Sequence, residues 1–512
     1  MKSLKGIITD TMFIGFVQVC NVILTIISTG IILKFLGAQQ YGLLSIYRLF
    51  TVKGFLSFFD FGFKKPLARE FAYANGKKDY EKFNRLISVM FFLSISIALL
   101  IVAGLFFIVP KFVVWTNIPN TYREKFIFFI RVTFFLSIID IPGFFIMSLF
   151  EGLNRYKILK TLELFQAMFF SIIAIIFSLK RCNVDSLIVV FMLTTTLFSL
   201  IRLFVMFDFL KYINFSLGDI WYEFKILLNQ ARFYFLANLS STIGNYAPNL
   251  IISILFNPTL VAYADVIQKM PRVIKNSMGF IGQNLMVVTS ERAANNDKFF
   301  VSRLFNNGLK LYQFILIPIT IVFAVFIKPI LSAWLGQSYS SVLYKYSIFA
   351  VLSIALFPVA SFGWNFLSGY AIKLEKLALF QWTVTGTKVF ILLIFSKLLG
   401  LWTIVITLWV FIVVLPLNMR YYVKYLDMDI KSYLLDLARI LSVCLMLSYV
   451  FYNIDSINWL ISFSLALIFS YLTAFFLYLR DNERMYFLRL FRIKKYGFIL
   501  RKGEGYVKEK TI

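Results

Sequence analysis

The chain has 512 residues, of which 60% are hydrophobic and only 15% are charged, a balance that a water-soluble domain of this size cannot bury. With 52 Lys and Arg against 25 Asp and Glu, the formal net charge is +27, which favours nucleic acid, anionic lipid or an anionic substrate as partner. Histidine is absent, which excludes imidazole bases and His-ligated metal sites.

Apolar stretches long enough to cross a bilayer recur along the chain. In chain order they cover residues 11–35, 41–63, 86–109, 126–150, 158–179, 186–209, 232–256, 259–289, 303–327, 342–367, 376–397, 400–422, 433–453 and 457–479. They predict an all-α polytopic membrane protein with about 14 transmembrane helices. The stretches 41–63 and 259–289 contain several charges and score poorly on hydropathy alone.

The connections differ in charge from one side to the other. Lys and Arg gather in residues 64–85, in the turn 151–157 and in a tail at 481–512, whereas connections such as 257–258 carry no Lys or Arg. The positive-inside rule then places both termini in the cytoplasm. We expect the tail to contact anionic membrane lipids rather than nucleic acid. Residues 211–231 have aromatic and aliphatic side chains at helical spacing and predict a cytoplasmic linker helix.

Some basic residues remain inside the predicted spans, where each costs roughly 2.5–3.5 kcal/mol at a helix centre unless it meets water or a partner. Those well inside their spans predict a cation-lined cavity: Arg48, Lys53, Lys269, Arg272 and Lys275. Two more are further cavity candidates: Arg131 and Lys388. Those nearer span ends are expected to snorkel to the interface: Arg202, Lys310 and Lys345.

The acidic residues at similar depth are chiefly Asp60, Asp140 and Asp265, which are candidates for ion coupling or for pairing with nearby Lys or Arg. Asp265, Lys269 and Arg272 follow one another at steps of four and three residues, so they share one helical face. No cofactor or metal site is indicated.

The two charged spans also predict an internal repeat. They are the second and the eighth, which are equivalent positions if six spans repeat after six more. Aligning Tyr41 with Tyr263 brings Lys53 opposite Lys275. The linker at 211–231 falls between the two halves.

Several short motifs resemble those of Wzx-like polysaccharide flippases, a branch of the multidrug/oligosaccharidyl-lipid/polysaccharide (MOP) exporter superfamily. The motifs are Phe35-Leu36-Gly37-Ala38-Gln39-Gln40-Tyr41-Gly42, Asp60-Phe61-Gly62, Glu151-Gly152-Leu153-Asn154-Arg155-Tyr156-Lys157, the Tyr263-to-Glu291 span and Leu367-Ser368-Gly369 to Lys373. Related flippases often carry basic residues in the first span, but here that span offers only Gln18 and Asn21 as polar candidates.

The resemblance implies two six-helix lobes around a central cleft: an N-terminal lobe at 1–210 and a C-terminal lobe at 232–425, followed by two helices at 426–480 and the tail at 481–512. It implies a monomer of the inner (cytoplasmic) membrane that flips a lipid-linked oligosaccharide to the outer leaflet by alternating access, with polysaccharide-assembly proteins as further partners. It implies a transporter, not an enzyme.

Two other functions fit parts of the sequence. A membrane glycosyltransferase or polysaccharide polymerase could use the acid pair of Asp427-Met428-Asp429 to hold a metal-bound diphosphate, but the charges of a solvated cytoplasmic loop are the favoured explanation of the pair. A drug or cation exporter of the same superfamily would share the fold, but cationic cargo favours carboxylates in the cavity.

Overall fold

The computed structural model describes residues 4–209, 220–275, 298–356, 374–454 and 458–479. In the first half, the helices are α1 (Leu4–Leu49), the 3-10 helix η1 (Phe55–Asp60), α2 (Lys64–Lys77), α3 (Tyr80–Trp115), α4 (Asn120–Gly152), α5 (Tyr156–Leu179) and α6 (Val184–Phe209). The second half contains α7 (Ile220–Leu255), an unlabelled helix at 258–275, α9 (Lys298–Val325), α10 (Ile327–Leu335), α11 (Gln337–Leu352), η2 (Ser353–Leu356), α13 (Leu374–Leu399), α14 (Leu401–Trp409), α15 (Phe411–Leu426), α16 (Ile430–Tyr452) and α17 (Trp459–Leu477).

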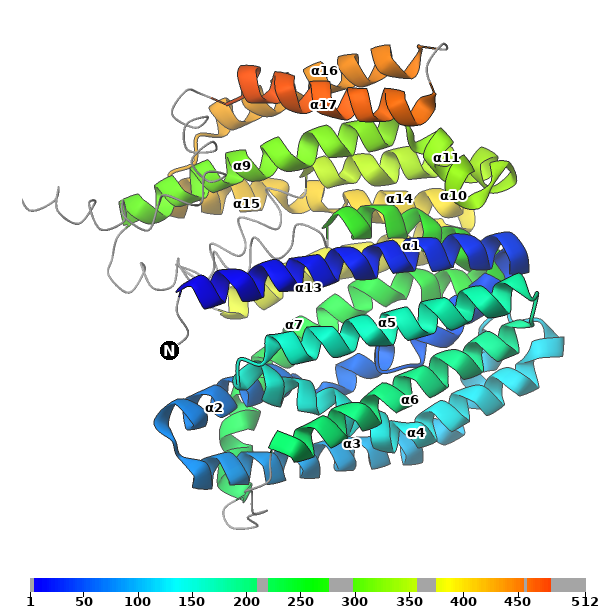
Figure 1. Ribbon diagram of the computed structural model, residues 1–512, viewed down its shortest axis with the longest axis vertical. Coiled ribbons are helices and arrows are strands. Elements are labelled where there is room, and N and C mark those ends of the chain that lie inside the picture. The colour runs from blue at the N-terminus through cyan, green and yellow to red at the C-terminus, as the bar shows by residue number, and fades with distance from the viewer. Residues whose placement is uncertain (1–3, 210–219, 276–297, 357–373, 455–457, 480–512) are drawn as a thin grey trace, which may run out of the picture.

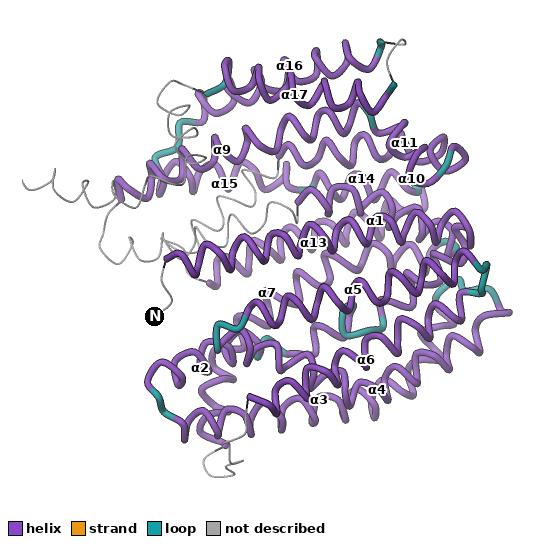
Figure 2. Tube along the Cα trace, viewed as in Figure 1, coloured by secondary structure: helices purple, strands orange, loops and turns teal. Residues whose placement is uncertain are grey.

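The all-α prediction is confirmed, because the described chain consists of helices joined by short turns (Figure 2). Nine helices in the described ranges are long and apolar enough to cross a membrane, and α14 with α15 forms a bent pair that passes the same test. Of the two charged spans, residues 41–49 form the end of the long candidate span Phe13–Leu49. Only residues 259–275 of the other lie in the described part of the chain.

The helices form two groups (Figure 1). Helices α2 to α6 pack together on one side, α9 to α11 and α14 to α17 gather on the other, and α1, α7 and α13 run between them. Helices α16 and α17 pack on α9, where the Tyr471 hydroxyl donates to the Ile315 carbonyl at 2.6 Å and the Tyr478 hydroxyl donates to Gln313 Oε1 at 2.7 Å. The exact lobe boundaries remain a prediction.

The second predicted span, 41–63, is not one helix. Helix α1 contains the first span and the beginning of the second, joined across Gly37. The φ of Gly37 is 83°, a left-handed angle that glycine adopts without steric cost, and α1 then ends at Leu49. A turn and η1 follow, so the span is broken in the middle of its charged stretch. Gly54 lies in this break, where a β-carbon would meet the Arg48 and Leu49 carbonyl oxygens at 2.3 and 2.5 Å.

Some other helix boundaries also differ from those of the predicted spans. Helix α7 is continuous from Ile220, so the described part of the expected linker at 211–231 is the first part of a long helix. The span 400–422 is divided between α14 and α15. The span 342–367 is helical to Leu352, with η2 after it. The rest of that span, the end of 259–289 and the tail at 481–512 lie outside the described residues.

Candidate functional site

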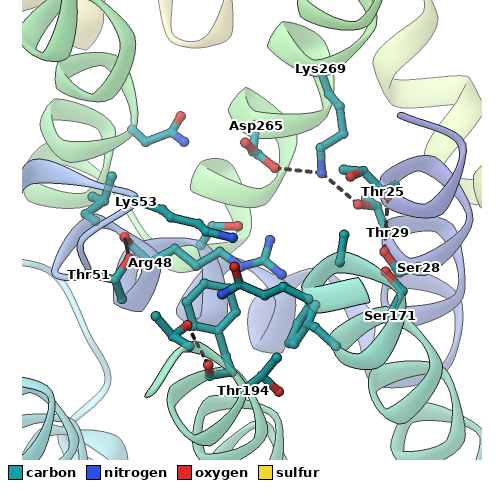
Figure 3. A pocket seen from close by; sticks show the side chains of 18 of the residues that line it. Thr25, Ser28, Thr29, Arg48, Thr51, Lys53, Ser171, Thr194, Asp265 and Lys269 are labelled. Atoms are coloured by element: carbon teal, nitrogen blue, oxygen red, sulfur yellow. Dashed lines mark hydrogen bonds and ion pairs between the residues drawn. The ribbon is translucent and has the colours of Figure 1, made fainter. Parts of the chain in front are cut away.

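A cavity of about 310 Å³ lies among α1, the break that follows it, α5, α6, α7 and the helix at 258–275 (Figure 3). It draws side chains from both sequence halves. The charged residues that line it are Arg48, Lys53, Asp265, Lys269 and Arg272. Four of the five cations that the sequence placed in one cavity therefore do share one, and the structure adds a single carboxylate to them.

The break in the second span positions Lys53. Because the backbone leaves the helix after Leu49, Lys53 projects from a turn rather than from a helix face, and its side chain points toward Arg48 in the cavity (Figure 3). Its own carbonyl accepts a hydrogen bond from the Tyr246 hydroxyl of α7. A side chain from the facing helix thus provides a hydrogen bond to one of the backbone carbonyls in the break.

Arg48 is held by two aromatic rings. Its guanidinium carbon lies 5.2 Å from the centroid of Phe170 on α5 and 5.2 Å from that of Phe191 on α6. Such cation-π contacts fix the guanidinium without neutralising it. The Arg48 Nε is buried and has no hydrogen-bond partner in the described chain. Arg48 is therefore oriented and still able to donate.

Lys269 is the most neutralised of the four cations. Its ammonium lies 3.3 Å from Asp265 Oδ2 and donates to the Thr29 hydroxyl at 2.6 Å and to the Tyr41 hydroxyl at 2.7 Å. Tyr41 in turn donates to Asp265 at 2.5 Å. Figure 3 shows Lys269 reaching across from its helix to α1. This network ties the helix at 258–275 to both parts of α1.

Three of the cations that line the cavity have no carboxylate partner among the described residues. Within the described ranges, no carboxylate forms an ion pair with Arg48, Lys53 or Arg272. The ion pair that Asp265 forms is with Lys269. A cavity with several cations and one carboxylate has a strongly positive potential, because surrounding low-dielectric helices screen the charges poorly.

Three of the predicted cavity cations do not line it. Lys275 and Lys388 each lie 5.2 Å from the ring of Phe411 on α15, and Arg131 sits on α4. Lys275 does not line this cavity, because one more turn of the helix carries it past, and its part in binding stays a prediction. Its suggested equivalence to Lys53 does not extend to the cavity lining.

Asp60 and Asp140 also lie away from the cavity lining. Asp60 Oδ1 accepts from the Gly62 amide at 2.8 Å, so it stabilises the turn between η1 and α2. Asp140 is buried on α4, where the Thr196 hydroxyl donates to its Oδ2 at 3.4 Å. Whether any carboxylate takes part in ion coupling stays a prediction.

Arg202 and Lys310 both have partners inside the protein, and whether Lys310 also reaches the membrane interface stays a prediction. Arg202 is buried on α6 and donates to Gln166 Oε1 at 2.7 Å, and Gln166 lines the cavity. Lys310 pairs with Asp436 of α16 at 3.5 Å. Only Lys345 is exposed, over the ring of Tyr344. Partners on neighbouring helices, which a single span does not show, decide these positions.

The sequence analysis missed the uncharged lining. Hydroxyls from α1, the break after it, α5 and α6 surround the cations: Thr25, Ser28, Thr29, Ser45, Thr51, Ser171, Thr194 and Thr195. The first span therefore does contribute polar side chains, although not the expected Gln18 or Asn21. The run 194–196 of three threonines inside an apolar span was a usable signal.

The helices around the cavity meet on both sides of it. Near α10, the Trp334 indole donates to the Ile26 carbonyl at 2.7 Å, and a β-carbon on Gly42 would overlap the Pro258 carbonyl. Near α2, Glu70 accepts from Lys82 of α3 at 2.7 Å and from Gln230 of α7 at 3.2 Å. These bonds from Lys82 and Gln230 outweigh the opposing effect of burial and lower the pKa of Glu70.

No protein-family model matches the chain, and no curated protein sequence matches it. Solved structures do. The lipid II flippase MurJ in an inward closed conformation is 13% identical with a TM-score of 0.70, over 92% of this chain and 98% of that one. A multidrug resistance MATE family transporter of the MOP superfamily, facing inward, is 15% identical with a TM-score of 0.66, over 80% and 95%.

A third solved structure is that of a MOP superfamily transporter from Pyrococcus furiosus, described as having a binding pocket of reverse polarity. It is 14% identical with a TM-score of 0.59, over 82% of this chain and 96% of that one. The chain thus shares its fold with the lipid II flippase over 92% of its length and with the two MOP superfamily transporters over 80% and 82%, and it is a multi-pass membrane protein. These structural neighbours are transporters and flippases rather than enzymes.

Proposed function

We propose that this chain is a Wzx-like flippase that moves a lipid-linked oligosaccharide, carried on a polyprenyl diphosphate, from the cytoplasmic to the outer leaflet of the inner membrane. One observation carries the proposal: Arg48, Lys53 and Arg272 face one cavity, and no carboxylate among the described residues pairs with them. The fold, shared with a lipid II flippase, supports a lipid-linked cargo.

The charge of the cavity matches the main physical obstacle to such a cargo. A diphosphate cannot enter hydrocarbon as an anion unless protein charges replace its hydration. At about 4 Å, a pair of unit charges attracts by roughly 4 kcal/mol in the effective dielectric near a protein surface. Three cations facing one cavity therefore offer enough attraction to offset much of the desolvation cost.

Alternating access would need the contacts on either side of the cavity to open in turn. One set joins α1 to α10 through Trp334 and Ile26. The other joins α2 and α3 to α7 through Glu70 and through Arg85, whose Nε lies 3.6 Å from Glu223 Oε1. Both sets consist of a few side-chain contacts, which a rocking motion can break and remake. We further propose a monomer with both termini in the cytoplasm.

The alternative of a glycosyltransferase or polymerase finds less support. In the acid pair it would use, Asp429 caps α16 by accepting from the amides of Lys431 at 3.0 Å and Ser432 at 3.3 Å. Asp427 has left-handed backbone angles at the end of α15, and Met428 between them is buried. The geometry of these acids is that of a helix boundary.

A drug or cation exporter would share the fold but requires a cavity that attracts cations. In the cavity observed here, a cationic drug would meet Arg48, Lys53 and Arg272, with Asp265 already engaged by Lys269 and Tyr41. The repulsion favours an anionic cargo.

The test is translocation in proteoliposomes that contain a fluorescent polyprenyl diphosphate oligosaccharide. The wild-type chain should expose the lipid to an external quencher faster than empty liposomes do. With Arg, Lys, Gln or Glu at position 272, the translocation rate should fall in that order. Lys keeps the charge but loses the bidentate fork, Gln loses the charge and Glu reverses it. Lys345→Glu, outside the cavity, is the charge-matched control. If the Arg272→Glu variant translocates as fast as Arg272→Lys, the proposal fails.

A further inference from the structure

The α1–α6 wall of the cavity, which includes the break directly after α1, carries hydroxyl groups whose hydrogen bonding the cations do not explain. The hydroxyls of Thr25, Thr51 and Thr195 donate to backbone carbonyls of their own segments at 2.7, 2.9 and 2.9 Å. Each hydroxyl has one proton to donate and two lone pairs to accept with. Once the proton is committed to the backbone, such a hydroxyl can only accept from a ligand.

Acceptors of this kind suit only part of the proposed cargo. Arg and Lys side chains are donors without acceptor capacity, so they match the oxygens of a deprotonated diphosphate. That diphosphate has no proton to give to Thr25, Thr51 or Thr195. Sugar hydroxyls and acetamido N–H groups do have protons to give. The cavity therefore offers donors for phosphate and acceptors for sugar.

Two further hydroxyls on the same wall are buried without any partner in the described chain. Ser45 on α1 is 5% exposed and Thr194 on α6 is 3% exposed, and neither side-chain oxygen forms a hydrogen bond. Buried polar atoms in native proteins are nearly always satisfied, by protein, water or ligand. Both residues line the cavity, so a ligand there is in position to complete their bonding.

We propose that this α1–α6 wall is a subsite for the sugar attached directly to the diphosphate, with Ser45 and Thr194 as its specificity-determining residues. The inference rests on the flippase function proposed above. It adds an assignment of each part of the cargo to one part of the cavity. The phosphates lie with Arg48 and Arg272, and the first sugar lies beside them against the hydroxyls.

The relative positions of these residues fit a sugar next to a phosphate. Ser45 precedes Arg48 by one helical turn on α1, and Thr194 follows Phe191 by one turn on α6. Arg48 itself rests on Phe191. The two unpartnered hydroxyls thus flank the guanidinium on neighbouring helices. The rings of Phe170 and Phe191 already face that guanidinium, so hydrogen bonding rather than ring stacking is left to recognise the sugar.

The experiment compares the binding of three lipids to the purified chain in detergent: farnesyl diphosphate, and the same lipid with one glucose or one N-acetylglucosamine on its terminal phosphate. At least one sugar-bearing lipid should bind wild type more tightly than farnesyl diphosphate does. Ser45→Ala and Thr194→Val should each lower the affinity for that sugar-bearing lipid about threefold to tenfold, as expected for one lost hydrogen bond. Neither change should alter the affinity for farnesyl diphosphate.

Two controls separate recognition from folding. Thr194→Ser keeps the hydroxyl and should retain the preference for the sugar-bearing lipid. Thr320→Val makes the Thr-to-Val change at a buried site on α9, where the hydroxyl donates to the Leu316 carbonyl, and should leave all affinities unchanged. If the three lipids bind wild type equally, or if Thr194→Val keeps the sugar preference, the subsite is refuted while the diphosphate site stands. If none of the lipids binds, both proposals are refuted.

Discussion

Replacing Arg48 is the sharpest single perturbation of the cavity, because its guanidinium is fixed by Phe170 and Phe191 and is not paired with any described carboxylate. A charge-assisted hydrogen bond is worth about 1.5–3 kcal/mol, so Arg48→Gln should weaken diphosphate binding about tenfold to 150-fold. Arg48→Lys keeps the charge but loses the planar fork and its stacking, which should cost about 1.5 kcal/mol, or roughly tenfold. Arg48→Glu should abolish binding.

The assay is equilibrium binding of farnesyl diphosphate to each purified variant, with thermal unfolding measured in parallel. Lys125→Gln is the matched control, since Lys125 is 60% exposed and pairs with Asp185 away from the cavity. The reasoning is refuted if Arg48→Gln and Lys125→Gln both bind the lipid as tightly as wild type does. A parallel loss of unfolding temperature in Arg48→Gln alone would instead assign Arg48 a packing role.

Three other predictions concern the framework around the cavity. Asp265→Asn leaves Lys269 buried without its counterion and should destabilise the fold by about 3–5 kcal/mol, seen as a lower unfolding temperature; unchanged stability would show that the pair is dispensable. Glu70→Gln should lower stability at neutral pH by about 1–2 kcal/mol. Because the pKa of Glu70 is lowered in the folded chain, its stabilisation is present above the ordinary carboxyl pKa and lost as pH falls through the folded value, so mutant and wild type should converge in acid; a constant gap would contradict this. A cysteine at Asn154, in the turn between α4 and α5, should be labelled only from the cytoplasm, and labelling by an impermeant reagent from outside would invert the topology.

The fold was largely predictable because hydrophobic length is a strong signal in membrane chains. Helices α3 to α6, α16 and α17 each correspond to one predicted span. The exceptions are the charged spans, where the sequence could show that charges lie at membrane depth but not that the backbone leaves the helix after Leu49. The Tyr246 hydroxyl that bonds to this break comes from α7, so it is a tertiary contact. The close approach of Gly54 to the Arg48 and Leu49 carbonyls is local, but it exists only once the backbone has turned.

The positive charge of the cavity was predictable from the sequence, but the residues that line it were only partly predictable. Spacing along one helix placed Lys269 and Arg272 together, and the cavity does contain them. It could not show that Lys269 is bound to Asp265 and Thr29 or that Lys275 faces Phe411 instead. Helical periodicity gives the relative direction of side chains within one element. What each direction meets is decided by the neighbouring helices.

The central claim is that the cavity recognises an anionic headgroup, and its most direct test is the order of affinities for farnesyl diphosphate, farnesyl monophosphate and farnesol. These lipids share one tail and differ in headgroup charge. The wild-type chain should bind them in that order, with the differences shrinking at high salt, and a variant with Arg48, Lys53 and Arg272 all changed to Gln should bind the three nearly alike. If farnesol binds wild type as tightly as farnesyl diphosphate does, the cavity does not recognise negative charge and the account is contradicted.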